Sequence, residues 1–185
     1  ILLGCSGRYR ELYPDTPSKG AYTAYLQARV LREQQRYDDA LRAIDAAIDR
    51  DPTALALAAE RADLLRLAGR VDEAAAQIDA LPDELPKVRF VRALVRDAEG
   101  QHDEALRLLD ALCADEPADP DAALNLARIA LEQQQPELAK QALTRLTTAA
   151  PDFARGWLAL GNLCYELRDY AAAVVAYEGY LLRDI

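Results

Sequence analysis

The stretch from Trp157 to Ala173 reads WLALGNLCYELRDYAAA, in which a Leu-Gly pair ends at Gly161 and an alanine follows that glycine by twelve residues. The same step of twelve residues, from a small residue to an alanine, occurs four more times upstream. A step that recurs in one register over most of a chain indicates an internal repeat of one structural unit. The other copies are Ala28 to Ala40, Ala62 to Ala74, Ala93 to Ala105 and Ala127 to Ala139.

Prolines occupy a second fixed place in this repeat. Pro52, Pro117 and Pro151 each lie twenty-four residues after the small residue of their copy. An aromatic start, a Leu-Gly pair, a later alanine and a closing proline, in this order, resemble the tetratricopeptide repeat, a helix–turn–helix unit of about 34 residues. The resemblance implies an all-α fold, a right-handed α-solenoid of about five helix pairs whose first helices line the concave side.

The repeat register divides the chain into a leading segment, 1–20, and a solenoid, 21–185. Each unit is expected to begin with a first helix of about fourteen residues, followed by a short turn and a second helix with apolar residues at three-and-four spacing. The second unit is shorter than its neighbours and contains Pro82, which lacks a backbone donor and predicts that its second helix stops near Leu81. The predicted units are 21–54, 55–85, 86–119, 120–153 and 154–185.

Composition excludes several classes of function. The formal net charge of −9 argues against nucleic-acid binding, which depends on Lys and Arg contacts to phosphates. The sequence contains no run of eighteen apolar residues that would span a membrane as a helix. Three cysteines at irregular spacing do not form a disulfide framework or a zinc-binding motif.

The residues that catalysis would need are scarce. His102 is the only histidine, and it occupies a turn position that Tyr37 and Tyr170 fill in other units, so we predict a packing role for it. Cys113 and Cys164 fall at positions that face neighbouring helices, where thiols behave as small apolar groups. The sequence has no Gly-rich phosphate loop, H-E-x-x-H or G-x-S-x-G motif. We therefore predict that the chain is not an enzyme and has no cofactor, metal site or catalytic residues.

A binding surface is predicted instead on the first helices. The resemblance places partner contacts at the second, fifth, ninth, twelfth and thirteenth positions of each first helix, where six basic and six acidic side chains stand among Tyr, Leu and Phe. This mixture suits a peptide or helix of a partner protein lying in a groove. The carboxylate clamp of some relatives is incomplete here, because Ala159 stands where that clamp needs Arg. The predicted partner-binding residues are Tyr22, Tyr25, Arg29, Arg32, Asp63, Arg66, Lys87, Phe90, Arg128, Arg155, Asn162 and Tyr165.

Arginines replace the family's usual apolar residues on one helix of the third unit. Arg89, Arg92 and Arg96 are three and four residues apart and share one helix face, and Arg61 adds a fourth in the second unit. We interpret them as structural ion-pairing groups between repeats, because buried Arg requires paired carboxylates, which Glu60, Asp63 or Glu99 would supply. The alternative is a recognition patch for an acidic partner segment.

The leading segment carries a second resemblance. Leu2, Leu3, Gly4 and Cys5 follow the order of a bacterial lipobox, in which a small residue precedes the cysteine that receives lipid. This order predicts lipidation at Cys5. Ser6 follows that cysteine in place of Asp, which favours the outer membrane.

These features together predict a protein-interaction scaffold or assembly factor, lipid-anchored to the outer membrane and facing the periplasm. Tetratricopeptide lipoproteins tend to work in envelope complexes such as pilus, secretion or polysaccharide-export machines. Two alternatives stay open at this level: a cytoplasmic adaptor whose Leu-Leu-Gly-Cys is accidental, and the regulatory arm of a longer enzyme.

Overall fold

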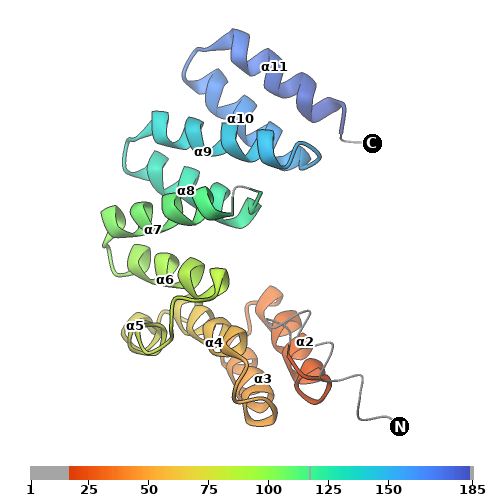
Figure 1. The fold of residues 1–185 in the computed structure, drawn as a ribbon, viewed down its shortest axis with the longest axis vertical. Helices are drawn as coiled ribbons and strands as arrows, with labels where there is room; N and C mark the ends of the chain where they lie inside the picture. Colours follow the sequence, from red (N-terminus) through yellow and green to blue (C-terminus); the bar gives the residue numbers. More distant parts are fainter. Residues whose placement is uncertain (1–16, 117, 184–185) are drawn as a thin grey trace. The chain divides into compact units, whose positions relative to one another are not determined.

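A computed structural model describes residues 17–116 and 118–183, and within these residues the chain forms ten α-helices in five consecutive pairs (Figure 1). This confirms the predicted all-α fold of paired helices. Among these described helices, none has both the length and the apolar composition needed to cross a membrane. The first helices are α2 (Lys19–Glu33), α4 (Leu55–Leu67), α6 (Pro86–Ala98), α8 (Pro120–Glu132) and α10 (Ala154–Glu166); the second helices are α3 (Tyr37–Arg50), α5 (Val71–Asp79), α7 (His102–Asp115), α9 (Pro136–Ala149) and α11 (Tyr170–Leu181).

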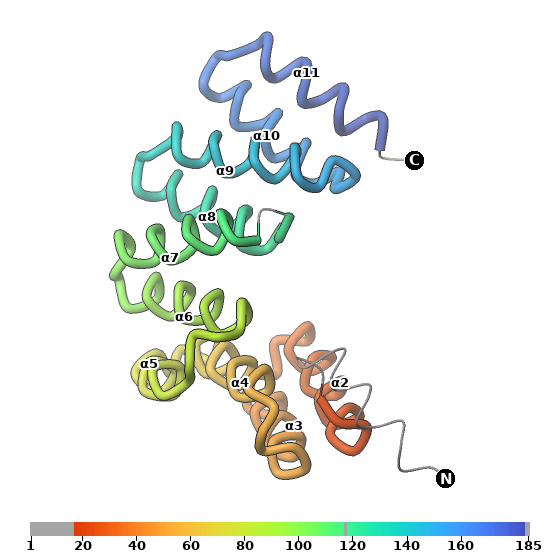
Figure 2. The backbone as a smooth tube through the Cα atoms, in the orientation of Figure 1, coloured from red at the N-terminus to blue at the C-terminus, as the bar shows by residue number. Residues whose placement is uncertain are grey.

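The helices fall into two compact units, divided after Gln101. In unit 1, α2 packs against α3 and α4 against α5, while α4 also contacts α3 and α6. In unit 2, α8 packs against α9 and α10 against α11, with α7 against α8 and α9 against α10 (Figure 2). The division falls in the turn between the two helices of the third predicted repeat. The right-handed winding of the whole array stays a prediction.

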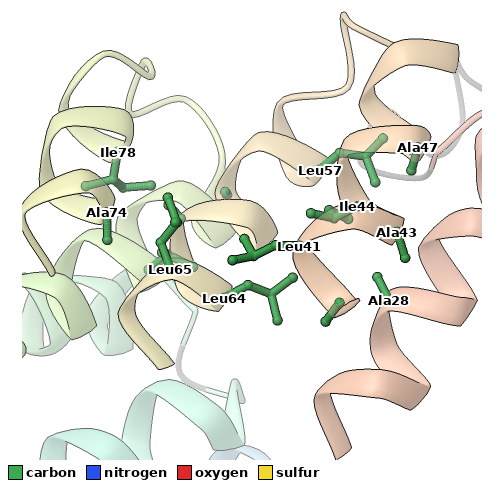
Figure 3. Close-up of a cluster of buried hydrophobic side chains, with 14 of the residues drawn as sticks. Ala28, Leu41, Ala43, Ile44, Ala47, Leu57, Leu64, Leu65, Ala74 and Ile78 are labelled. Carbon is green, nitrogen blue, oxygen red and sulfur yellow. The ribbon is translucent and has the colours of Figure 1, made fainter. Parts of the chain in front are cut away.

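Unit 1 has a core of aliphatic side chains to which the helices α2 to α6 all contribute, and Figure 3 shows part of it. Leu41 and Ile44 of α3 and Leu64 of α4 belong to one buried cluster, which Ile78 of α5 extends. Small residues such as Ala28, fully enclosed in α2, let the helix axes approach closely. Each buried Leu or Ile contributes on the order of 2 kcal/mol, so apolar stacking is the main force that holds the helices together.

The turns inside the five pairs share one backbone geometry. The second residue after each first helix has a positive φ, and the next residue donates its N–H to a carbonyl five residues earlier. This is the Schellman motif, whose left-handed residue is usually glycine. The left-handed residues are Gln35, Gly69, Gly100, Gln134 and Arg168.

Glycine at position 134 should stabilise unit 2. Gln134 has φ 58°, a conformation in which the Cβ atom of any non-glycine residue is strained. We expect Gln134→Gly to raise the free energy of unfolding by about 1 kcal/mol, measured by urea denaturation. Gly69→Gln is the reverse control, because a Cβ there meets no atom within 4 Å and its cost is purely conformational. Destabilisation by Gln134→Gly would contradict this account.

Gly179 of α11 lies against the indole of Trp157 from α10. A Cβ atom at position 179 would lie 2.5 Å from Cε3 of Trp157. The indole has little freedom to move, since its Nε1 donates to the Pro151 carbonyl at 2.7 Å and the Arg183 guanidinium lies 4.9 Å from the ring centre. Glycine is therefore required for the close packing of α10 and α11.

We expect Gly179→Ala to lower the free energy of unfolding of unit 2 by about 1.5 kcal/mol, although alanine gains about 1 kcal/mol in helix propensity. The fluorescence of Trp157, the only tryptophan, reports this transition during urea denaturation. Gly20→Ala in α2 is the matched control, followed by circular dichroism because it lies in unit 1; a Cβ there meets no atom within 4 Å and stability should not fall. Equal effects at the two positions would show that the contact with Trp157 is unimportant.

Candidate functional site

Eight of the predicted partner-binding residues lie on the three first helices of unit 1. We call this set the first-helix face of unit 1. Tyr22, Tyr25, Arg29 and Arg32 come from α2, Asp63 and Arg66 from α4, and Lys87 and Phe90 from α6.

Aromatic and basic side chains meet on α2. The rings of Tyr22 and Tyr25 are 6.3 Å apart and tilted, and Tyr22 is exposed. The guanidinium of Arg29 lies 6.0 Å from the centre of the Tyr25 ring. A cation beside an aromatic ring presents both a charge and a flat apolar surface, a combination that protein interfaces favour.

Two buried carboxylates connect the three helices. Arg32 of α2 contacts Glu60 at 2.8 Å and Asp63 at 2.9 Å, both on α4. Asp63 also pairs with Arg66 at 2.6 Å, and Glu60 lies 3.2 Å from the Nζ atom of Lys87 on α6. Burial lowers the pKa of the Arg32 guanidinium, but the charges of Asp63 and Glu60 outweigh this and leave its pKa above the ordinary value.

The acidic and basic members of this network differ in exposure. The Asp63 side chain is 1% exposed, whereas that of Arg32 is 32% exposed. Asp63 was predicted to contact a partner, but its carboxylate is enclosed and holds two arginines. Glu60 was not predicted to belong to this site. Its signal in the sequence is an acidic residue at a position where the first and third units carry Leu26 and Val91. The face therefore presents basic groups over buried acids.

The predicted residues of unit 2 make local contacts instead. Arg128 pairs with Glu132 of its own helix at 2.9 Å, and Asn162 accepts a hydrogen bond from the Tyr177 hydroxyl at 3.0 Å. Tyr165 is exposed and its ring lies 5.7 Å from that of Tyr170. Arg155 is exposed on α10.

Arg92 and Arg96 of α6 have the structural role that we predicted. Arg92 is buried and donates to the carbonyls of Ile78 and Leu81 at 2.9 and 2.8 Å, and it also pairs with Asp83. The Ile78 carbonyl lies in the last turn of α5, which stops at Asp79, and the Leu81 carbonyl lies just after it, at the residue where the helix was predicted to end. Arg92 thus caps the short second helix of the second repeat.

The predicted carboxylate partners of these arginines were only partly right. Arg96 pairs with Glu99 at 2.7 Å, as predicted, and with Asp79 at 2.5 Å. Arg61 pairs with Asp45 at 2.7 Å. Glu60 and Asp63 instead serve the first-helix face of unit 1.

An open hollow of about 660 Å³ lies between the second helices α7 and α9 of unit 2. Asp110 and Arg145 on its wall pair with each other at 2.5 Å, and Lys140 pairs with Asp169 at 2.7 Å. Asp110, Lys140 and Arg145 are therefore engaged in ion pairs, and the described residues contain no cluster of three His, Cys, Asp or Glu side chains suited to a metal ion.

Both described cysteines are buried, as predicted, and burial raises the pKa of the Cys113 thiol to about 11. Burial also raises the pKa of Cys164. Since the thiolate is the reactive form, we expect both thiols to react with a disulfide reagent at pH 8 at least about 100-fold more slowly than in urea-unfolded chain. Because the folded pKa is raised, the Cys113 contribution to stability is complete below pH 9 and is lost as pH rises through about 11. Fast native labelling of Cys113 would contradict its burial.

Comparisons with known proteins agree with this architecture. Tetratricopeptide repeat models match residues 25–88, 98–163 and 154–184. No curated protein matches the chain.

Solved structures with low sequence identity share the fold. PilF of Pseudomonas aeruginosa is 16% identical with a TM-score of 0.69, covering 89% of this chain and 77% of its own. A TPR protein of Thermus thermophilus is 17% identical with a TM-score of 0.69, covering 88% and 91% of the two chains. MamA of Desulfovibrio magneticus is 17% identical with a TM-score of 0.62, covering 91% and 97%. The sequence register, the helix pairs and the matching family models show that this chain is a tetratricopeptide repeat protein.

Proposed function

We propose that the chain is a scaffold that holds a peptide or helix of a partner protein on the first-helix face of unit 1. The observation that carries this proposal is the placement of the partly exposed Arg32, Arg66 and Lys87 beside the buried Glu60 and Asp63. The buried acids fix the directions of the basic groups before a partner arrives. A preorganised face loses less side-chain entropy on binding than a mobile one.

The chemistry of this face favours a segment with both acidic and apolar residues. Tyr22 and Tyr25 offer flat surfaces on which apolar groups can pack, and the exposed Arg29 adds a positive charge beside the Tyr25 ring. Phe90 lies 5.8 Å from the Nζ atom of Lys87 and repeats the pairing of ring and cation on α6. A peptide or a helix laid across these groups matches known modes of peptide recognition.

Site-specific crosslinking in the producing cell tests the face directly. A photoreactive residue at Tyr22 should give a crosslinked partner, and the same residue at Gln141, exposed on the second helix α9, should not. Arg29→Glu should abolish the crosslink at Tyr22 without unfolding the protein, because Arg29 lies outside the buried network. Arg107→Glu, an exposed charge reversal on α7, is the matched control. Equal crosslinking at Tyr22 and Gln141 would argue against binding at this face.

We further propose a lipid anchor at Cys5 and a place in a bacterial envelope complex such as a pilus, secretion or polysaccharide-export machine, facing the periplasm from the outer membrane. Support comes from the sequence order of Leu2, Leu3, Gly4 and Cys5, which lies outside the described residues. A diacylglyceryl chain would tether the scaffold beside membrane complexes.

Mass spectrometry of the N-terminal peptide, from the gene expressed in a bacterial host with its own upstream sequence, tests the anchor. A peptide that begins at Cys5 with a diacylglyceryl adduct is the expected result, and Cys5→Ala should remove the adduct. An unmodified Cys5 within an intact chain would overturn the anchor. It would direct the search for partners to the cytoplasm and leave the crosslinking result on the first-helix face unaffected.

A further inference from the structure

The ion-pair network of unit 1 holds more cations than carboxylates. Its cations are Arg32, Arg66 and Lys87, and its carboxylates are Glu60 and Asp63. Three positive charges against two negative ones leave one positive charge that no member of the network balances. The side chains of the two acids are at most 5% exposed, so this excess lies where water screens charges poorly.

The carboxylate oxygens of the network are all engaged. Oε1 of Glu60 lies 2.8 Å from Arg32, and Oε2 lies 3.2 Å from Lys87. Oδ1 of Asp63 lies 2.6 Å from Arg66, and Oδ2 lies 2.9 Å from Arg32. A further cation at this place would find each oxygen already shared with a cation and would meet three like charges. The network therefore repels a basic ligand.

The cations, in contrast, keep unused donors. Arg32 contacts the two acids through Nη1 and Nη2, so its Nε–H has no acceptor among the residues that the structure describes. Arg66 donates Nε and Nη2 to Asp63, which leaves Nη1 without an acceptor in the same described part of the chain. Lys87 has three N–H donors and contacts one carboxylate, that of Glu60. Since these groups donate and cannot accept, the ligand that completes the network is an anion.

Two exposed charges of α2 lie beside the network and cancel each other. Glu33 is negative and its field reaches Arg32, while Arg29, four residues earlier, is positive. Both side chains are exposed, so water screens them more than it screens the enclosed Asp63. The excess of one positive charge therefore remains.

An aromatic ring accompanies the cation at the α6 side of the network. Lys87 lies 5.8 Å from the centre of the Phe90 ring, and Arg32 and Lys87 hold opposite oxygens of the same Glu60 carboxylate. The nitrogen atoms of the two cations thus lie on either side of one small group, within the reach of one further carboxylate. An apolar side chain next to that carboxylate would have the Phe90 ring to pack on.

We infer that the first-helix face of unit 1 binds one carboxylate of the partner segment at Arg32 and Lys87, with a neighbouring apolar side chain on Phe90. This inference rests on the proposed function and names the group that the face recognises. One carboxylate brings the network to three charges of each sign, whereas a phosphate group, at about −2, would exceed this balance. The carboxylate belongs either to an Asp or Glu side chain or to the end of the partner chain.

Selection of binders from a library of random linear peptides, on the purified chain, tests the inference. The selected peptides should share an acidic group beside an apolar residue. Replacing a selected Asp by Asn, or Glu by Gln, should weaken binding at least about 10-fold, because the charge-assisted contact is lost. Loss of binding when the carboxyl terminus is amidated would assign the carboxylate to the chain end, and retention would assign it to the side chain.

Lys87→Gln removes the excess charge and leaves two cations with two carboxylates. It should weaken binding of the selected acidic peptides at least about 10-fold, while Lys87→Arg should restore most of it. Lys19→Gln makes the same charge change at an exposed position of α2 and is the matched control, with binding expected to fall less than about 2-fold. Circular dichroism checks that helix content is unchanged in all three variants.

The outcomes separate this inference from the proposed function. Peptide binding that survives both Lys87→Gln and the change of the acid to its amide would overturn the carboxylate site, even if a partner still crosslinks at Tyr22. Selected peptides without an acidic group would overturn it too. If acid-dependent binding at Lys87 is found but no cellular partner crosslinks at Tyr22, the carboxylate site stands and the scaffold function falls.

Discussion

Arg92→Ala is expected to lower the free energy of unfolding by about 3 kcal/mol, the largest effect that we predict for a single side chain. The substitution removes two donors from the Ile78 and Leu81 carbonyls and the cation from Asp79 and Asp83. Carbonyls at the end of a helix have no partner within that helix and must be satisfied from elsewhere. Urea denaturation followed by circular dichroism measures the loss.

Two comparisons make this result specific. Arg61→Ala breaks an ion pair with the half-exposed Asp45 and should cost less than about 1 kcal/mol. Since Trp157 lies in unit 2, its fluorescence should shift less than the circular dichroism signal if the loss is confined to unit 1. A stable Arg92→Ala protein that has lost its partner would instead make Arg92 a recognition residue.

The sequence predicted the helix pairs well because each pair repeats the same apolar spacing. The turns show the limit of this approach. Glycine marks only two of the five left-handed turn residues, at Gly69 and Gly100, while Gln35, Gln134 and Arg168 adopt the same conformation without a glycine signal. Their conformation is imposed by the packing of the flanking helices, which acts equally on all five repeats.

The partners of the arginines could not be predicted from helix periodicity alone. Asp83 lies in the irregular segment after α5, where no fixed spacing tells which direction a side chain takes. Shortening of the second repeat brings this segment within reach of Arg92 on α6. The sequence thus indicated that Arg92 needs carboxylates. The fold of the shortened repeat places Asp79 and Asp83 beside it.

The charge of the first-helix face of unit 1 is a second feature that the sequence alone did not predict correctly. Counting residues at the groove positions gives equal numbers of acids and bases, which predicted a neutral surface. Of the counted acids in unit 1, Asp63 is buried whereas Glu33 is exposed, and the bases Arg32 and Lys87 are partly exposed. A count treats all side chains at equal depth, so it missed that Asp63 is enclosed by the arginines that it pairs with.

Asp63→Ala is expected to lower the free energy of unfolding by about 2.5 kcal/mol. The Asp63 carboxylate accepts from Arg32 of α2 and Arg66 of α4, and its removal leaves two guanidiniums close together without the charge between them. The partial exposure of both arginines lets water replace some of the lost contact, so the cost stays below that of Arg92→Ala. Circular dichroism during urea denaturation measures it, because Asp63 lies in unit 1.

Asp63→Asn separates charge from shape, since it keeps the volume of the side chain and one acceptor oxygen. It should lose most of the same stability and should also weaken the crosslink at Tyr22, because Arg32 then keeps only its ion pair with Glu60. Glu132→Ala, which breaks the exposed pair with Arg128, is the control and should cost about 0.5 kcal/mol. If Asp63→Asn kept full stability but lost the partner, Asp63 would serve recognition alone, and the buried network would not be what preorganises this face.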